Sequence, residues 1–221
     1  GFTGTIPKED FQKRSLQISI GEVVGKVTAS ELQEKGVLSN CHINIKQFVD
    51  YSTHKTYQDE LRYLLETKER MEALADMIME IAKTGNTLVL IDRIDPGKFL
   101  VECMPGSVFL SGSSKSDIRR DRYAEIEKSE NSITVASTGI AAVGINLVNL
   151  YNLVLIEPGK SFVRVIQSIG RGLRKGRDKD FVNVYDVTSS CKFSKRHLTK
   201  RKEYYREAGY PFSIDKIDWV K

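Results

Sequence analysis

The strongest chemical signal in the sequence is a pair of arginines three residues apart. Arg171 and Arg174 lie in the stretch QSIGRGLRK, residues 167–175. On a helical turn this spacing directs both side chains to one face. Guanidinium groups stay charged and donate paired hydrogen bonds, so two of them side by side suit a polyphosphate. Gly170 leaves the approach to Arg171 open, and Gln167 adds a neutral donor and acceptor. The alternative is the solvated end of a basic helix.

A second candidate segment is ASTGIAAVGIN, residues 136–146. Ser137 and Thr138 offer small hydroxyl side chains, and the residues around them offer backbone amides suited to phosphate oxygens. Gly144 would allow a ligand to approach the backbone closely. Serine and glycine are also common in ordinary turns, so this segment by itself leaves a plain turn as the alternative.

Short apolar runs bounded by turn residues predict the elements that position these segments. The runs cover residues 87–92, 107–112, 132–137, 152–157 and 181–187, and helical patterns separate them. This alternation predicts a doubly wound α/β domain with a parallel sheet, from about residue 87 to 187. Ligands of such sheets lie off the carboxyl ends of the strands. The segment 136–146 begins at such an end, and the segment 167–175 comes shortly after another.

The flanking sequence predicts further elements. Ile18 and Ile20 alternate with polar residues and predict a strand, and a capping box at 28–31 predicts a short helix. Residues 41–51 read as a strand and residues 57–83 as two helices ending before Gly85. The tail predicts a basic helix over 192–210, followed by a short element at 214–219 that packs back on the domain.

Composition excludes several classes of protein. The 221 residues carry a net charge of +5, are 40% hydrophobic and contain no apolar run long enough for a membrane helix. The three cysteines form no CxxC pair, so we expect neither a zinc site nor a disulfide framework, and no other metal site. We expect a cytoplasmic protein.

The order of these segments resembles the second RecA-like domain of superfamily 2 helicases. Residues 137–146 match motif V, Q-x-x-G-R-x-x-R matches motif VI, and TLVLIDR (87–93) occupies the place of motif IV. The opening GFTGTIP is similar to motif III, with Gly4 at a position that commonly holds Ala. Together with the "IGR-x-LRK" pattern, this resembles the UvsW-type helicases of T4-like phages.

The resemblance implies a RecA-like P-loop NTPase fold and a division of the chain. Residues 1–7 would end a preceding RecA-like domain, and 8–84 would be a linker or α+β insertion. Residues 85–191 would form the second RecA-like domain, and 192–221 the basic helix and tail. The sequence contains no G-x-x-x-x-G-K-[ST] and no DEAD- or DEAH-type box. ATP and Mg²⁺ would therefore be held mainly by an upstream domain, and these residues alone would not hydrolyse ATP.

The resemblance also assigns roles to single residues. Arg174 would be the arginine finger, with Arg171 beside it on the γ-phosphate and Gln167 orienting the nucleotide. Further nucleotide contacts would come from Gly144, Gly170 and Asn146, the last at a position where many family members carry Asp.

Nucleic-acid contacts are expected at strand ends and on the basic tail helix. Small hydroxyls and amides at strand ends suit a phosphate backbone, and a basic helix suits duplex or branched DNA. Arg93 could equally pair with Asp92, and the tail helix could simply be solvated, with its tyrosines on the core. The candidates are Arg93, Ser111, Gly112, Ser137, Thr138, Lys195, Arg196, Lys200 and Arg201.

These inferences lead to one predicted function and one alternative. The prediction is an ATP-dependent DNA helicase or translocase that acts on branched DNA in recombination or repair, with RNA as the alternative polymer. The alternative is a stand-alone module that binds or anneals nucleic acid and has no ATPase activity of its own.

Overall fold

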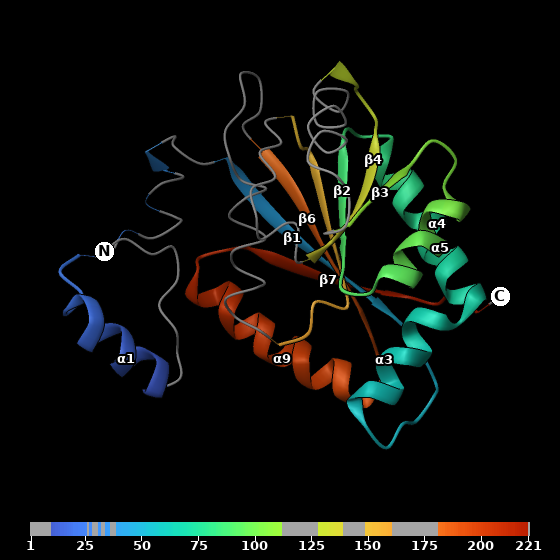
Figure 1. Ribbon diagram of the computed structural model, residues 1–221. Coiled ribbons are helices and arrows are strands. Elements are labelled where there is room, and N and C mark those ends of the chain that lie inside the picture. Colours follow the sequence, from blue (N-terminus) through green and yellow to red (C-terminus); the bar gives the residue numbers. More distant parts are fainter. Residues whose placement is uncertain are drawn as a thin grey trace.

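The structure, a computed structural model, is built around one parallel sheet. It describes residues 10–25, 27, 31, 34–35, 39–111, 128–138, 149–160 and 181–220. The seven strands run in the order β3-β4-β2-β5-β6-β1-β7, and every neighbouring pair is parallel (Figure 1). Their bounds are β1 Asn40–Phe48, β2 Thr87–Ile91, β3 Val108–Leu110, β4 Ile133–Ser137, β5 Asn152–Ile156, β6 Phe181–Ser189 and β7 Phe212–Ile217.

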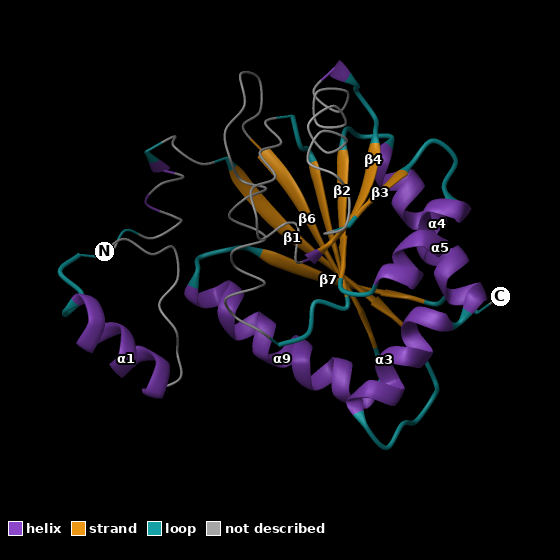
Figure 2. Cartoon of the chain, in the orientation of Figure 1, coloured by secondary structure: helices purple, strands orange, loops and turns teal. Residues whose placement is uncertain are grey.

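Helices cover both faces of the sheet (Figure 2). Three helices, α3 (Tyr57–Glu66), α4 (Lys68–Ala82) and α5 (Ile94–Cys103), pack on one face, and α9 (Lys192–Glu207) packs on the other. Alternate residues of each central strand feed the two cores, because successive side chains point to opposite faces. In β2, Leu88 belongs to the core under α9 and Val89 to the core under α3–α5. The predicted doubly wound α/β architecture is confirmed.

The helices predicted at 57–83 and 192–210 and the five core strands are found close to their expected bounds. The helical stretch at 57–83 divides at Thr67 into α3 and α4, as predicted. The hydroxyl of Thr56 accepts a hydrogen bond from the Asp59 amide at 3.2 Å and so caps the start of α3. None of the described helices is long and apolar enough to cross a membrane.

The predicted strand at residues 16–20 is wrong, because these residues belong to helix α1 (Asp10–Ile20). The hydroxyls of Ser15 and Ser19 each bond the carbonyl four residues earlier, which is a helical contact. No strand among the described residues lies beside this segment, and a helix satisfies its own backbone groups where a lone strand cannot. The two isoleucines that suggested a strand, Ile18 and Ile20, are exposed.

The sheet is wider than the predicted range of 87–187. Strand β1 was expected, but within an insertion outside the sheet; it pairs with β6 along nine residues. Strand β7 then pairs with β1 and forms the outer edge of the sheet. Periodicity identifies a strand but not its neighbours, which is why the sequence placed β1 outside the sheet. The predicted short helix near residue 31 and the assignment of residues 1–7 fall mainly outside the described residues.

Candidate functional site

All seven strands end at the same edge of the sheet, because they are parallel. Strand pairing brings Ser137, at the end of β4, level with Ile91 at the end of β2. Beside them, Leu110 in the last position of β3 pairs with Ala136. Four predicted contact residues therefore lie along one stretch of this edge, namely Arg93, Ser111, Ser137 and Thr138. Their arrangement agrees with the prediction, and nucleic-acid contact by them stays a prediction.

The environments of these four residues differ. Arg93 precedes α5 and donates from Nη2 to Oε1 of Gln58 on α3 at 3.0 Å. An Asp92–Arg93 ion pair, the alternative considered for this position, is not among the contacts of Arg93 with described residues. Ser111 is buried, whereas Ser137 and Thr138 are partly exposed. The second pair is therefore the more accessible to a ligand.

Seven of the predicted site residues lie outside the described residues. They are Gly112, Gly144, Asn146, Gln167, Gly170, Arg171 and Arg174. Their roles stay predictions. The structure does describe the turn at 157–160, which follows β5 and enters the segment that carries the two arginines.

Helix α9 contains four of the predicted basic contacts, and three of them face solvent. Lys195, Arg196 and Lys200 are exposed, and Nζ of Lys200 lies 3.0 Å from Oε2 of Glu203. Arg201 departs from the prediction, because only 1% of it is exposed. A buried guanidinium cannot reach the phosphates of a polymer outside the protein, so Lys195, Arg196 and Lys200 remain the predicted contacts on α9.

Arg201 instead holds together strand β6, its own helix and the turn after β5. Its Nε and Nη2 donate to the two carboxylate oxygens of Asp186, both at 2.8 Å. Its Nη1 donates to the carbonyl of Gly159 at 2.7 Å. The hydroxyl of Tyr204 adds a bond to the carbonyl of Lys160 at 3.3 Å. Helix α9 therefore fixes two consecutive carbonyls of the turn at 157–160.

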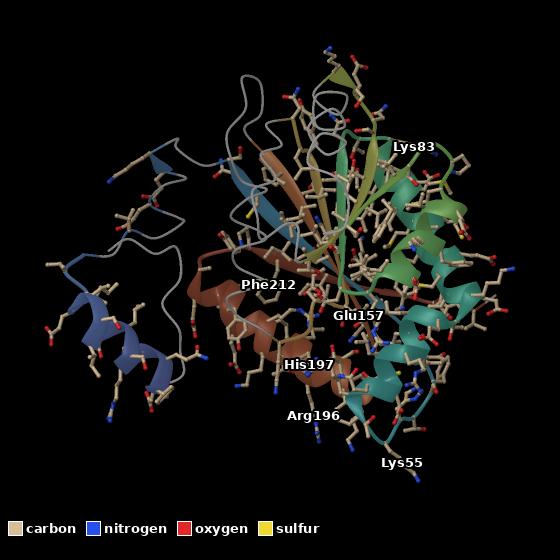
Figure 3. The ribbon with its side chains drawn as sticks, in the orientation of Figure 1. Lys55, Lys83, Glu157, Arg196, His197 and Phe212 are labelled. Atoms are coloured by element: carbon tan, nitrogen blue, oxygen red, sulfur yellow. The ribbon has the colours of Figure 1, made fainter. Side chains whose placement is uncertain are left out.

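A second buried arginine fixes the same turn from the opposite face of the sheet. Arg70 of α4 donates from Nη2 to Oε1 of Glu157 at 3.1 Å and from Nε to Asp50 at 3.2 Å. Its Nη1 donates to the Leu64 carbonyl at 2.7 Å. On the other side, Ser194 of α9 donates to Oε2 of Glu157 at 3.2 Å. Glu157, at the carboxyl end of β5, thus joins helices from both layers (Figure 3).

Glu60 of α3 forms part of the same network and binds the first turn of α9. Its carboxylate accepts hydrogen bonds from the backbone amides of Phe193 and Ser194, at 2.9 and 2.7 Å, and from the Ser194 hydroxyl. A carboxylate at a helix N-terminus meets unpaired N–H groups and the positive end of the helix dipole. The start of α9 is therefore already occupied by an acidic group of the protein.

The network contains more carboxylates than guanidinium groups, and this affects proton binding. Asp50, Glu60, Glu157 and Asp186 are all buried, against two buried arginines. Burial raises the pKa of Glu157 to about 7, Arg70 and Arg201 oppose this, and Asp50 and Asp186 reinforce it. The backbone of Glu157 also has a φ of 42°, in the left-handed region that residues other than glycine rarely adopt.

The described carboxylates do not fit a metal ion. Each of the four buried carboxylates already accepts bonds from an arginine, a hydroxyl or a backbone amide, and no group of described residues has the composition of a metal site. Magnesium is therefore not assigned to any residue that the structure describes.

Sequence analysis missed the buried network, although a signal for it exists. Arg70 lies four residues before Leu74 on the apolar face of α4, and Glu60 lies four before Leu64 on α3. Arg201 likewise lies four before the buried Tyr205. A charged residue inside an apolar stripe is either misplaced or paired, and the periodicity alone does not give its partner.

Residues 69–176 match the protein family described as "Helicase conserved C-terminal domain". This range runs from α4 through β5 and includes both sequence motifs. The ATP-dependent DNA helicase uvsW of Enterobacteria phage T4 is 28% identical over 195 residues, which are 83% of this chain and 39% of the relative. The chain thus spans well under half the length of this relative.

Solved structures show the same fold. The crystal structure of T4 UvsW superposes with a TM-score of 0.72 and 23% identity, over 83% of this chain and 42% of that one. A fragment of a putative HsdR subunit of a type I restriction enzyme from Vibrio vulnificus also gives a TM-score of 0.72. It is 15% identical over 96% of this chain and 43% of the HsdR chain. The family match at residues 69–176 and the shared fold together identify a helicase C-terminal domain with a RecA-like fold in this chain.

Proposed function

We propose that the chain is the second motor domain of an ATP-dependent helicase or translocase that acts on DNA. One observation carries the proposal: the helicase family match at 69–176 includes both the STG…GIN and the Q-x-x-G-R-x-x-R segments. The first segment begins at the end of β4, and the second comes after β5 in the sequence. Ligands of such folds bind at the carboxyl edge, where these strands end.

In this proposal the arginines act on ATP bound mainly by a preceding RecA-like domain. Arg174 is the arginine finger, Arg171 contacts the γ-phosphate beside it, and Gln167 orients the nucleotide. A finger stabilises the charge of the transition state and contributes roughly 10³–10⁵ in rate. Gly144, Asn146 and Gly170 complete the nucleotide contacts and link the nucleotide state to the bound polymer.

The geometry of the turn at 157–160 supports this division of labour. Arg70 and Ser194 bind its Glu157 side chain, and Arg201 binds its Gly159 carbonyl. The chain then continues directly into residues 161–180. A fixed starting point suits a segment whose arginines must meet a phosphate within a fraction of an ångström.

The polymer would lie along the carboxyl edge and reach α9. Arg93, Ser137 and Thr138, with Ser111 and Gly112 next to them, would contact phosphates at the strand ends. Exposed cations of α9, among them Lys195, Arg196 and Lys200, would add sequence-independent affinity. We propose DNA over RNA because the T4 relative is a DNA helicase. The substrate we propose is branched DNA in recombination or repair.

A binding or annealing module without ATPase activity is the second candidate. It is favoured by the absence of any G-x-x-x-x-G-K-[ST] in the 221 residues and by the exposed basic face of α9. The two candidates differ in whether the arginines of residues 167–175 do chemistry.

The deciding experiment measures DNA-stimulated ATP hydrolysis by a protein extended upstream through the preceding domain. We expect Arg174→Ala to lower turnover by two or more orders of magnitude while DNA binding is retained. Lys175→Ala, the adjacent cation, is the matched control and should retain most of the turnover. Unchanged turnover in Arg174→Ala would make the binding module the better description.

Two further measurements refine the outcome. The 221-residue chain alone should bind DNA weakly and hydrolyse no ATP, so turnover by this chain would contradict the proposed division between two domains. Displacement of a strand from forked DNA by the extended protein distinguishes a helicase from a translocase that does not separate strands.

A further inference from the structure

Three aromatic rings meet where α3 and α9 begin, at the carboxyl edge of the sheet. Tyr57 of α3 lies between Phe193 and His197 of α9, and we call these three residues the aromatic cluster. Ring centroids of Tyr57 and His197 are 4.6 Å apart, and those of Tyr57 and Phe193 are 6.5 Å apart, both in edge-to-face arrangement. All three residues are partly exposed, so the cluster presents aromatic surface to solvent.

Two exposed cations flank this cluster. The Nζ of Lys192 lies 5.6 Å from the centroid of the Phe193 ring, and the Cζ of Arg196 lies 6.0 Å from it. In the part of the chain that the structure describes, neither cation forms an ion pair with a carboxylate. In Figure 3 the Arg196 side chain points away from the sheet, next to His197.

The nearest acidic groups are already bound to other partners. Glu60 accepts two backbone amides at the start of α9, and Asp59 accepts the hydroxyl of Thr56 at 2.7 Å. Glu157 lies buried beneath the cluster and is bound by Arg70 and Ser194. On the α9 side of the cluster the exposed charges are therefore positive, whereas the exposed carboxylate of Asp92 acts on Tyr57. The positive charge comes from side chains and not from the helix terminus.

His197 contributes an uncharged aromatic ring to this cluster and not a third cation. Burial lowers its pKa, and the charges of Arg201 and Lys160 lower it further. The unperturbed value is already below 7, so the imidazole is neutral at physiological pH. A neutral, partly exposed ring beside a phenyl ring offers a flat apolar surface.

Partly exposed rings flanked by exposed cations match one class of polymer. Single-stranded nucleic acids present unpaired bases, which stack on aromatic side chains, and phosphates, which bind lysine and arginine. In a duplex the base faces are covered by neighbouring bases, so the rings would add little. We propose that the aromatic cluster, with Lys192 and Arg196, is a binding site for single-stranded nucleic acid, with a base on the rings and phosphates on the two cations.

This inference rests on the proposed function, because it names the form of polymer that one surface of the motor domain binds. It adds a contact to bases, whereas the contacts proposed above are all to phosphates. The difference gives the two ideas different experimental signatures.

The test uses the 221-residue chain and fluorescently labelled strands of equal length, read by anisotropy. One strand is oligo-dT, and the other is an abasic strand with the same phosphates and no bases. The wild-type chain should bind oligo-dT about tenfold or more tighter than the abasic strand, since stacking of one base contributes on that order. Equal affinity for the two strands would overturn the proposal.

Two variants locate the effect. Phe193→Leu should remove most of the preference for oligo-dT and leave affinity for the abasic strand unchanged, and His197→Leu should do so in part. The amide of residue 193 still binds Glu60 in the leucine variant, so the start of α9 is preserved. Melting curves verify folding. If Phe193→Leu is unstable, His197→Leu decides, and an equal loss on both strands in that variant contradicts the proposal.

Matched controls separate this inference from the proposed function. Lys83→Ala, at the opposite end of the sheet in Figure 3, should change neither affinity. Binding of both strands with no preference for bases would overturn only the stacking site. Failure to bind any strand at low salt would contradict the nucleic-acid part of the proposed function as well.

Discussion

Arg201 and Asp186 form a two-pronged ion pair in the core beneath α9. Both bonds, Nε to Oδ2 and Nη2 to Oδ1, measure 2.8 Å, and each side chain is at most 1% exposed. The Tyr205 hydroxyl donates to the same carboxylate at 2.8 Å. The pair joins β6 to α9 and, through the Gly159 carbonyl, to the turn after β5. A residue of the basic tail helix thus forms part of the buried core.

Loss of Arg201 should destabilise the fold and not only the binding of nucleic acid. We expect Arg201→Met to lower the free energy of unfolding by about 3–5 kcal/mol, because Asp186 is left charged and buried without its partner. Urea denaturation measures the change. Arg206→Met, at an exposed cation on the same helix, is the control and should cost less than about 1 kcal/mol.

A double variant tests whether the cost comes from the unpaired charge. Adding Asp186→Leu to Arg201→Met removes both charges, so we expect part of the lost stability to return. A double variant that is less stable than Arg201→Met would show that packing, and not the orphaned carboxylate, dominates.

Glu157 should make stability depend on pH in the neutral range. Its pKa is raised from 4.5 to about 7, chiefly by burial, with Asp50 and Asp186 adding to this and Arg70 and Arg201 opposing it. Between these two values the folded chain keeps a proton that the unfolded chain releases. Stability from this group is therefore lost as pH rises from 4.5 to 7, by at most about 1.4 kcal/mol per pH unit.

Glu157→Gln isolates this contribution, because glutamine keeps the shape and does not titrate. Urea midpoints of both proteins at pH 5, 6, 7 and 8 give the comparison. The variant should gain stability relative to the wild type as the pH rises, and the gain should level off above pH 7. Parallel pH profiles would mean that Glu157 is charged throughout the range.

Gly97 should tolerate no side chain, although it lies inside helix α5. A Cβ built at this position would overlap the Phe109 ring of β3 and approach Ile91 to 3.1 Å. Gly97→Ala improves helix propensity, yet we expect a net loss of about 1–3 kcal/mol from overpacking. Gly25→Ala is the control, because a Cβ there meets nothing within 4 Å. A stabilised Gly97→Ala protein would contradict the close packing of α5 on β3.

Salt dependence should reveal which cations of α9 contact phosphates. Each phosphate contact contributes about −0.7 to −0.9 to the slope of log K against log salt. We expect Lys195→Ala and Arg196→Ala each to make the slope shallower by roughly that amount, measured by anisotropy with labelled DNA. Lys68→Ala, an exposed cation on α4 at the other face of the sheet, should leave the slope unchanged.

The sequence by itself predicted the class of fold and most of its elements. Five apolar runs became β2, β3, β4, β5 and β6, and the two helices at 57–83 became α3 and α4. The runs are short, apolar and bounded by turn residues, which favours buried strands, and the two helices show the helical period of apolar residues. The family was identified by a similar route, because its motifs are short segments with fixed spacing.

Local patterns failed where a short segment fitted two structures. The alternation of Ile18 and Ile20 suggested a strand, whereas residues 10–20 are helical. Two alternating isoleucines cannot separate the two periods when no buried face decides between them. The strand at 40–48 was recognised, but its place between β6 and β7 depends on partners about 140 and 170 residues later in the chain.

Only the tertiary structure decided which charges are buried and with whom they pair. Lys200 and Arg201 are adjacent in a basic stretch, yet Lys200 faces solvent and Arg201 binds Asp186 in the core. The direction in which a helix faces its sheet determines this difference, and so does the presence of a carboxylate at the matching strand position. The cost of burying a charge is met only by a partner held in place by the fold, and the local sequence does not specify that partner.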